Sequence, residues 1–349
     1  MAESHEVSWE LDGIAMEGTL VRPDGAGPFP AVVLVAGSGP TDRDWCSPLL
    51  PGRNGSGRLF AEAFAQAGIA SIRYDKRASG PRAAVNVPKL LGRLSMQSHL
   101  DELAGAVRAL AGTGVADPDR IVGLGNSEGA LHVLHYATGS QLLPFAGIVL
   151  AAPPGRPIQE VLLAQLALQS AQVPGGAEMM PKVREAAERY SAGRPMNPDP
   201  ALPDSVKMVL SSFEAPANLP LARELWAEST CDSLDRVRIP TLVLIGGRDV
   251  QIDVQADGGP LQMAAAGMPN VSFAFPPNAN HVFKEDRRTP AEVAASPGNG
   301  YNEPGTRLDP ESLEVILAWL RGSAGVLSGA SKLDGDRPGQ WPYGPAAAR

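Results

Sequence analysis

The stretch IVGLGNSEGALHVLHY, residues 121–136, contains the features that decide the fold. Its first residues are an apolar run of the kind that forms a strand buried on both faces of a sheet. Its last residues, from Ala130 onward, have the apolar spacing of a helix. Between them lies Gly125-Asn126-Ser127-Glu128-Gly129, where two glycines leave room for a very tight turn around the serine. The pattern predicts a strand, a sharp turn and a helix in direct succession.

The rest of the chain repeats this alternation of short apolar runs and helix-like stretches. Residues 7–21 alternate apolar and polar positions around Asp12-Gly13, which predicts an opening hairpin. Apolar runs typical of buried strands follow at 31–36, 69–74, 121–125, 148–152, 241–245 and 271–275. Because strands that alternate with helices join through right-handed crossovers, we expect an α/β fold. Its eight-stranded, mainly parallel sheet should be covered by helices on both faces.

One interval breaks this rhythm. Roughly 85 residues pass between Ala152 and Ile239 without a convincing strand, which is far longer than an ordinary connection. We therefore expect an inserted helical cap over the catalytic edge of the sheet. A last segment rich in Gly, Ala, Pro and Ser has the composition of a loosely ordered tail. The predicted divisions are a core of residues 1–153 and 232–322, a cap of residues 154–231 and a tail of residues 323–349.

Composition and charge exclude several classes of protein. With 44% hydrophobic and 19% charged residues, the chain of 349 residues is neither disordered nor fibrous. The 38 acidic residues outnumber the 30 basic ones, and no run of Lys or Arg forms a basic patch, so nucleic acid is not an expected partner. No stretch reaches the roughly 18 apolar residues that span a bilayer. The polar N-terminus lacks the features of a secretory signal, so we expect a cytoplasmic protein.

A serine in such a turn acts as a nucleophile when the chain also supplies a base and a carboxylate that orients the base. Of the five histidines, His281 is the expected base, because it lies in a loop just beyond the apolar run 271–275. Asp249 follows the preceding apolar run and is the expected carboxylate, with Asp253 as the alternative. The order Ser127, Asp249, His281 is the one expected for a triad built on this kind of turn.

Two backbone N–H groups should stabilise the negative charge that develops on the substrate oxygen. One belongs to Glu128, the residue after the serine. The other is expected from Ser38, in the loop Gly37-Ser38-Gly39-Pro40, because its neighbouring glycines permit close approach. The alternative is that this loop is a plain turn.

The apolar residues of the cap have two possible roles. They could form a hydrophobic, adaptable wall for an acyl or alcohol group, or they could simply pack the cap onto the sheet. The residues concerned are Met179, Met180, Met208 and the leucines between 162 and 168.

The remaining groups are expected to be structural. His132 and His135 lie on one helix without a third ligand, so we predict no metal, and no cofactor is expected. Cys46 and Cys231 fit neither a zinc pattern nor a disulfide framework and should be free thiols. The run Asp75-Lys76-Arg77 is expected to form a structural ion pair, and a role in ordering the loop Asp42-Arg43-Asp44 is a hypothesis.

Four motifs together resemble a known family. They are Gly-Ser-Gly-Pro-Thr-Asp-Arg-Asp at 37–44, Arg73-Tyr74-Asp75-Lys76-Arg77, Asp117-Pro118-Asp119-Arg120-Ile121 and Asn280-His281. They are similar to those of bacterial α/β-hydrolase esterases of the dienelactone-hydrolase-like group, over most of residues 7–322 apart from the cap. The resemblance implies the α/β-hydrolase fold and carboxylesterase activity, with the triad roles on Ser127, Asp249 and His281. Asn126 and Ala130 depart from the His and Gly that the family often has, which should alter the shape of the pocket.

We therefore expect a carboxylesterase-type serine hydrolase that cleaves a small-molecule ester through an acyl-enzyme on Ser127. The same triad could serve a thioesterase, a lactone or polyester hydrolase, or a serine peptidase, and the sequence does not separate these. A ligand receptor with the hydrolase fold is the alternative from another class. Neither the natural substrate nor the oligomeric state follows from the sequence.

Overall fold

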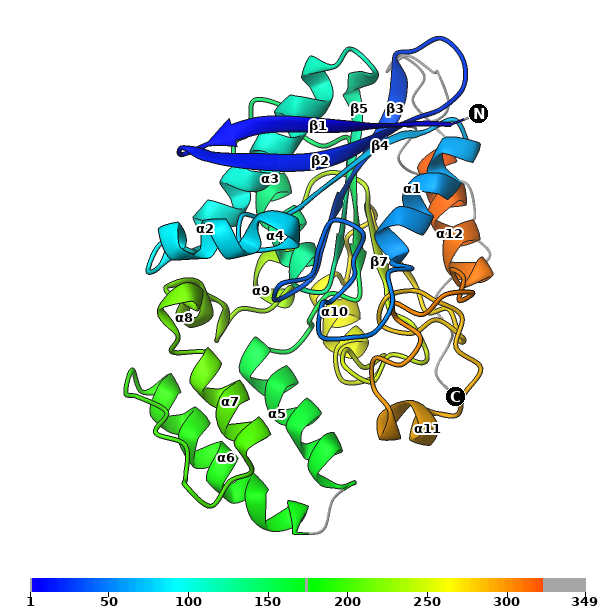
Figure 1. Ribbon diagram of the computed structural model, residues 1–349. Coiled ribbons are helices and arrows are strands. Elements are labelled where there is room, and N and C mark those ends of the chain that lie inside the picture. The colour runs from blue at the N-terminus through cyan, green and yellow to red at the C-terminus, as the bar shows by residue number, and fades with distance from the viewer. Residues whose placement is uncertain (1, 173–174, 323–349) are drawn as a thin grey trace.

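Figure 1 shows the computed structural model, which describes residues 2–172 and 175–322. Its centre is one eight-stranded sheet with the order β1-β2-β4-β3-β5-β6-β7-β8. The strands are β1 (Glu3–Leu11), β2 (Ile14–Arg22), β3 (Phe29–Val35), β4 (Ala70–Tyr74), β5 (Ala116–Asn126), β6 (Gly147–Ala151), β7 (Thr241–Leu244) and β8 (Val271–Ala274). The predicted tail, residues 323–349, lies outside the described residues.

The sheet is mainly parallel, as the sequence predicts. β1 and β2 form the antiparallel hairpin around Asp12 and Gly13, and β2 also runs antiparallel to β4. Every other neighbouring pair, from β4 to β8, is parallel. All residues of β3, β4, β6 and β7 are buried, because helices cover both faces. That double burial is the physical reason why the sequence shows continuous apolar runs rather than alternation.

Helices lie on both faces of the sheet. In Figure 1, α1 (Ser56–Gln66) and α12 (Pro310–Arg321) lie on one side, and α3 (Met96–Gly112) and α4 (Glu128–Thr138) lie on the other. Phe60 and Phe64 of α1 and Trp319 of α12 are completely or almost completely buried in the main core. The shorter elements of the core are η1 (Gly80–Arg82), α2 (Ala83–Leu90), α10 (Gly258–Ala264) and α11 (Pro290–Ala295).

The interval between β6 and β7 is helical. It contains α5 (Ile158–Ser170), α6 (Gly176–Ser191), α7 (Asp204–Ser212), η2 (Pro216–Asn218), α8 (Leu221–Leu225) and α9 (Cys231–Leu234), and its described residues include no strand. An apolar cluster of its own, separate from the main core, packs α5, α6 and α7 together around Tyr190 and Trp226. The bounds 154–231 for the cap stay a prediction.

Polar contacts fasten both ends of this helical segment to the core. At its beginning, the Arg156 guanidinium and the backbone N–H of Gly155 bind the buried carboxylate of Asp257. At its end, Glu228 lies 2.7 Å from His135 Nε2 on α4. The segment is therefore anchored at each of its two links to the sheet. Within the described residues, no helix is long and apolar enough to cross a bilayer.

Candidate active site

The predicted turn connects β5 directly to α4, which confirms the succession of strand, turn and helix. Ser127 has φ of 56° and ψ of −121°, a backbone conformation that is strained for any residue with a side chain. A Cβ atom at Gly125 would lie 2.1 Å from the carbonyl oxygen of Gly129, and one at Gly129 would lie 2.6 Å from that of Ala36. Both glycines are therefore required by close backbone approach, and the turn holds the serine at the carboxyl end of its strand.

The loops after the last two strands bring Asp249 and His281 together. His281 Nδ1 lies 2.7 Å from Asp249 Oδ2, and both side chains are buried. The other carboxylate oxygen, Oδ1, accepts hydrogen bonds from the backbone N–H groups of Gln251 and Ile252 at 2.8 and 3.0 Å. Asn126, next to the serine, donates a hydrogen bond of 3.0 Å to the His281 carbonyl. Position and orientation of the imidazole are thus fixed from two sides.

The alternative carboxylate, Asp253, is engaged elsewhere. Its Oδ1 accepts hydrogen bonds from the backbone N–H groups of Gln255 and Ala256, so it closes a turn of its own loop. Only Asp249 of the two candidates contacts the histidine.

Ser127 and His281 line the same cavity. In the described part of the chain the His281 ring is hydrogen-bonded to Asp249, and no hydrogen bond joins it to the Ser127 hydroxyl. Serine and histidine in such sites often form a short hydrogen bond only when substrate is present.

The loop after β3 passes directly beside the serine. A Cβ atom at Gly37 would lie 3.3 Å from Ser127 Cβ, and Ser38 lines the cavity. No backbone carbonyl accepts a hydrogen bond from the N–H of Ser38 or of Glu128 in the described part of the chain. Both of the predicted donors are therefore beside the serine and uncommitted to the backbone.

Residues at the end of β4 hold this loop in place. Asp75 accepts hydrogen bonds of 2.8 Å from the backbone N–H and from Nε of Arg43. Arg73 Nε lies 2.6 Å from Asp44 Oδ1. The run Asp75-Lys76-Arg77, expected to form a structural ion pair, contains two: Asp75 with Arg43 of the loop 42–44 and Arg77 with Glu102. Lys76 contacts the Gly37 carbonyl.

The cavity has a volume of about 560 Å³ and lies between the sheet edge and α5. No Lys, Arg, Asp or Glu is among the described residues that line it. Its walls are mostly apolar. The cap itself contributes the apolar side chains of Ile158, Val161, Leu162, Leu168 and Phe213 to this lining.

Of the two roles considered for the cap methionines, the structure favours packing over a wall of the cavity. Met179 and Met180 pack against the internal cluster of the cap, and Met208 is 72% exposed on α7. None of the three lines the cavity, whereas Leu162 and Leu168 do. The difference comes from how each helix is rotated about its axis. The side of α5 that carries Leu162 and Leu168 faces the cavity, whereas the apolar side of α6 packs against the other cap helices.

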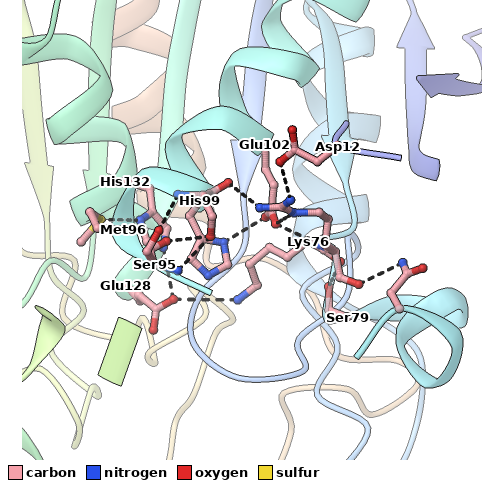
Figure 2. A network of polar contacts seen from close by, with 12 residues as sticks. Asp12, Lys76, Ser79, Ser95, Met96, His99, Glu102, Glu128 and His132 are labelled. Carbon is pink, nitrogen blue, oxygen red and sulfur yellow. Dashed lines mark hydrogen bonds and ion pairs between the residues drawn. The ribbon is translucent and has the colours of Figure 1, made fainter. Parts of the chain in front are cut away.

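Next to the turn lies a buried polar network (Figure 2), whose labelled residues are not among those that line the cavity. His132 Nε2 lies 3.2 Å from Glu128 Oε1, and His99 Nδ1 lies 2.9 Å from Glu102 Oε2. Burial lowers the pKa of His132 to about 4, which leaves the imidazole neutral near pH 7. Burial alone would raise the pKa of Glu128, but the hydrogen bond from His132 and the charge of Lys76 hold it well below its usual range. Sequence reasoning missed this network.

The same network contains the group that could bind a metal. Potential ligand atoms of His99, Glu128 and His132 lie within 4.8 Å of one another, whereas His135, the partner considered from sequence, pairs with Glu228 instead. The ammonium of Lys76 lies 4.0 Å from Glu128 Oε1 and already neutralises that carboxylate. A divalent cation beside this lysine would be repelled, so we assign no metal to the group.

Comparisons with known proteins identify the family and support the fold. The model of a family described as "Alpha/beta hydrolase family" matches residues 32–296. Esterase EstD of Thermotoga maritima is 29% identical over 309 residues, which are 87% of this chain and 65% of that protein. This chain therefore spans less than two thirds of that relative.

Solved structures share the fold at low sequence identity. The esterase Pf2001 of Pyrococcus furiosus has a TM-score of 0.51 and 17% identity, covering 91% of this chain and 92% of the other. A proline iminopeptidase of Mycobacterium smegmatis has a TM-score of 0.53 and 17% identity, covering 92% of this chain and 99% of the other. At these identities the likeness concerns the fold alone.

Proposed function

The chain belongs to the alpha/beta hydrolase family, and on that basis we propose that it is a serine hydrolase that cleaves carboxylic esters through an acyl-enzyme on Ser127. One observation carries the proposal: His281, held 2.7 Å from the buried Asp249, lines the same cavity as Ser127. The similarity to an esterase of Thermotoga maritima supports the choice of ester over other acyl groups.

The proposed mechanism follows from which imidazole nitrogen is occupied. Because Nδ1 of His281 faces Asp249, Nε2 is the nitrogen left to accept the proton of the Ser127 hydroxyl. The serine oxygen attacks the ester carbonyl, and the N–H groups of Ser38 and Glu128 stabilise the oxyanion. His281 then gives the proton to the departing alcohol, and a water molecule activated by the same nitrogen releases the acid.

The lining of the cavity narrows the proposed substrate to a neutral ester with an apolar acyl or alcohol group. A free N-terminal ammonium of a peptide, or the phosphates of a coenzyme A thioester, would meet no charged side chain among the described lining residues. Burying such a charge without a partner costs several kcal/mol. A neutral lactone or polyester fits the same lining and is the second candidate.

A substrate panel tests the proposal. Nitrophenyl esters with short and medium acyl chains, a neutral lactone, an aminoacyl anilide and an acyl-coenzyme A are assayed with wild-type protein and with Ser127→Ala. We expect turnover of the neutral esters by wild type and none above background by the variant. Equal turnover by both proteins would contradict the proposal. No turnover of any substrate, with no covalent adduct from a fluorophosphonate, would favour a ligand receptor.

A further inference from the structure

A single buried ammonium group lies between the two segments that carry the proposed oxyanion donors. Lys76 follows β4, is only 5% exposed, and contacts the loop at Gly37 and the side chain of Glu128. We infer that Lys76 is a positioning residue that sets the geometry of the oxyanion hole. The inference rests on the proposed function and adds a residue that the triad does not include.

The first contact fixes the orientation of one peptide group. Lys76 Nζ donates a hydrogen bond of 2.5 Å to the carbonyl oxygen of Gly37. That carbonyl and the N–H of Ser38 belong to the same peptide unit, and in a trans peptide they point in opposite directions. The described chain has cis peptides only before Pro28 and Pro220, so this unit is trans. By holding the Gly37 carbonyl, Lys76 keeps the N–H of Ser38 pointing away from itself, and Ser38 lines the cavity that also contains Ser127.

The second contact concerns the other donor. Glu128 provides the second proposed N–H, and its own carboxylate Oε1 lies 4.0 Å from Lys76 Nζ, as Figure 2 shows. His132, one helical turn further along α4, lies 3.2 Å from the same oxygen. The side chain of Glu128 is therefore held on the network side, which fixes the first turn of α4 and with it the direction of the backbone N–H.

The neighbouring residue provides a matched control. Arg77 is equally buried and equally cationic, but its guanidinium contacts Glu102, Asp12 and the carbonyl of Ser98. None of these groups belongs to either oxyanion segment. Lys76→Met and Arg77→Met thus each remove one buried cation from the same network, and only the first should change how the oxyanion is bound.

The experiment compares ester and thionoester substrates that differ only in the atom of the carbonyl group. Sulfur is larger than oxygen and a weaker hydrogen-bond acceptor, so aligned donors favour the oxygen substrate in the transition state. For Lys76→Met we expect kcat for the ester to fall about 10- to 100-fold. KM should change little, and the ratio of ester to thionoester turnover should drop. For Arg77→Met we expect lower stability, with kcat per folded molecule and the ratio both kept.

The outcomes separate this inference from the proposed function. Wild-type turnover that depends on Ser127, together with an unchanged kcat and ratio in folded Lys76→Met, would overturn the role of Lys76 alone. Turnover that survives in Ser127→Ala would overturn the proposed function first. A crystal structure of wild type phosphonylated at Ser127 tests the inference without any variant. We expect the phosphonyl oxygen near the N–H groups of Ser38 and Glu128, with Lys76 still on the Gly37 carbonyl; a peptide turned the other way would contradict it.

Discussion

The two sides of the Ser127 turn differ sharply in charge. On the cavity side, the described lining residues include no Lys, Arg, Asp or Glu. On the opposite side, charged residues such as Lys76, Arg77, Glu102 and Glu128 are almost completely buried, with His99 and His132 among them. Adjacent residues can thus face opposite environments, since Ser127 borders the cavity and the carboxylate of Glu128 belongs to the network.

The buried charges of this region therefore lie next to the turn and not in the cavity lining. A charged group in the cavity would select charged substrates, and a carboxylate there would also compete with the oxyanion for the backbone donors. Placed behind those donors, charges can hold the backbone rigid without touching substrate, and in a buried setting they interact strongly. If the two sides act separately, changes on the cavity side should alter turnover, and changes on the network side should alter stability and the alignment of the backbone donors.

The largest effect is expected on the cavity side. Asp249→Asn keeps the shape of the side chain but removes the charge that orients His281 and stabilises its cationic form. By analogy with serine triads we expect kcat to fall by about 10⁴-fold with little change in stability. Asp253→Asn is the matched control, because that carboxylate bonds only within its own loop. Steady-state kinetics of both variants provide the test. Equal losses of kcat in the two variants would show that Asp249 is wrongly assigned as the carboxylate of the triad.

On the network side, Arg77→Ala should affect stability before chemistry. It removes the guanidinium that lies 2.8 Å from the fully buried carboxylate of Glu102 and leaves the His99 imidazole as the remaining side-chain partner described for that carboxylate. Breaking a buried pair in this way costs about 3–5 kcal/mol of the free energy of unfolding. Urea denaturation followed by circular dichroism measures this loss. An equally stable but inactive Arg77→Ala protein would show that the network is needed for turnover, and it would contradict the division of roles between the two sides.

A smaller effect is a pH dependence of stability that originates in His132. Its pKa is lowered from 6.5 to about 4 by burial, so the unfolded chain binds a proton that the folded protein does not. The free energy of unfolding should therefore fall as pH drops from about 6.5 to 4, by up to roughly 3 kcal/mol from this residue. Denaturation midpoints of wild type and His132→Gln across this window provide the measurement. Identical slopes for the two proteins would refute this assignment.

The smallest effect is expected from the cap wall. Leu162→Ala should reduce kcat/KM for medium-chain esters by about tenfold relative to acetate esters, because the side chain lines the cavity. Met208→Ala, on an exposed position of α7, should leave the chain-length profile unchanged. Acyl-chain profiles of the two variants provide the check. A larger change of the chain-length profile in Met208→Ala would instead favour a methionine wall, the other role considered from the sequence.

Local patterns in the sequence were enough to predict the sheet and the turn. The apolar runs of β3 and β6 and the glycines at 125 and 129 reflect burial and backbone approach at the residues themselves. The pairing of Asp249 with His281 could also be predicted, because parallel strands bring their carboxyl ends to one edge. In both cases the relevant information lies in short segments whose positions follow from the topology.

The cap wall and the buried network could not be predicted in this way. Whether Met179 or Leu162 faces the cavity depends on how each helix is rotated about its axis, which composition does not determine. The network joins Lys76, His99 and Glu128, which lie on different elements and share no spacing pattern. Its only local signal is the capping box of Ser95 and Ser98, which starts α3 and sets the position of His99 on that helix.

Covalent labelling of the serine tests the central claim most directly. Wild type and Ser127→Ala are incubated with a fluorophosphonate, digested and analysed by peptide mass spectrometry. The proposal predicts one adduct on Ser127 in wild type, formed in parallel with the loss of ester turnover, and no adduct in the variant. Loss of turnover with the label on another residue, or turnover that continues after Ser127 is fully labelled, would contradict it.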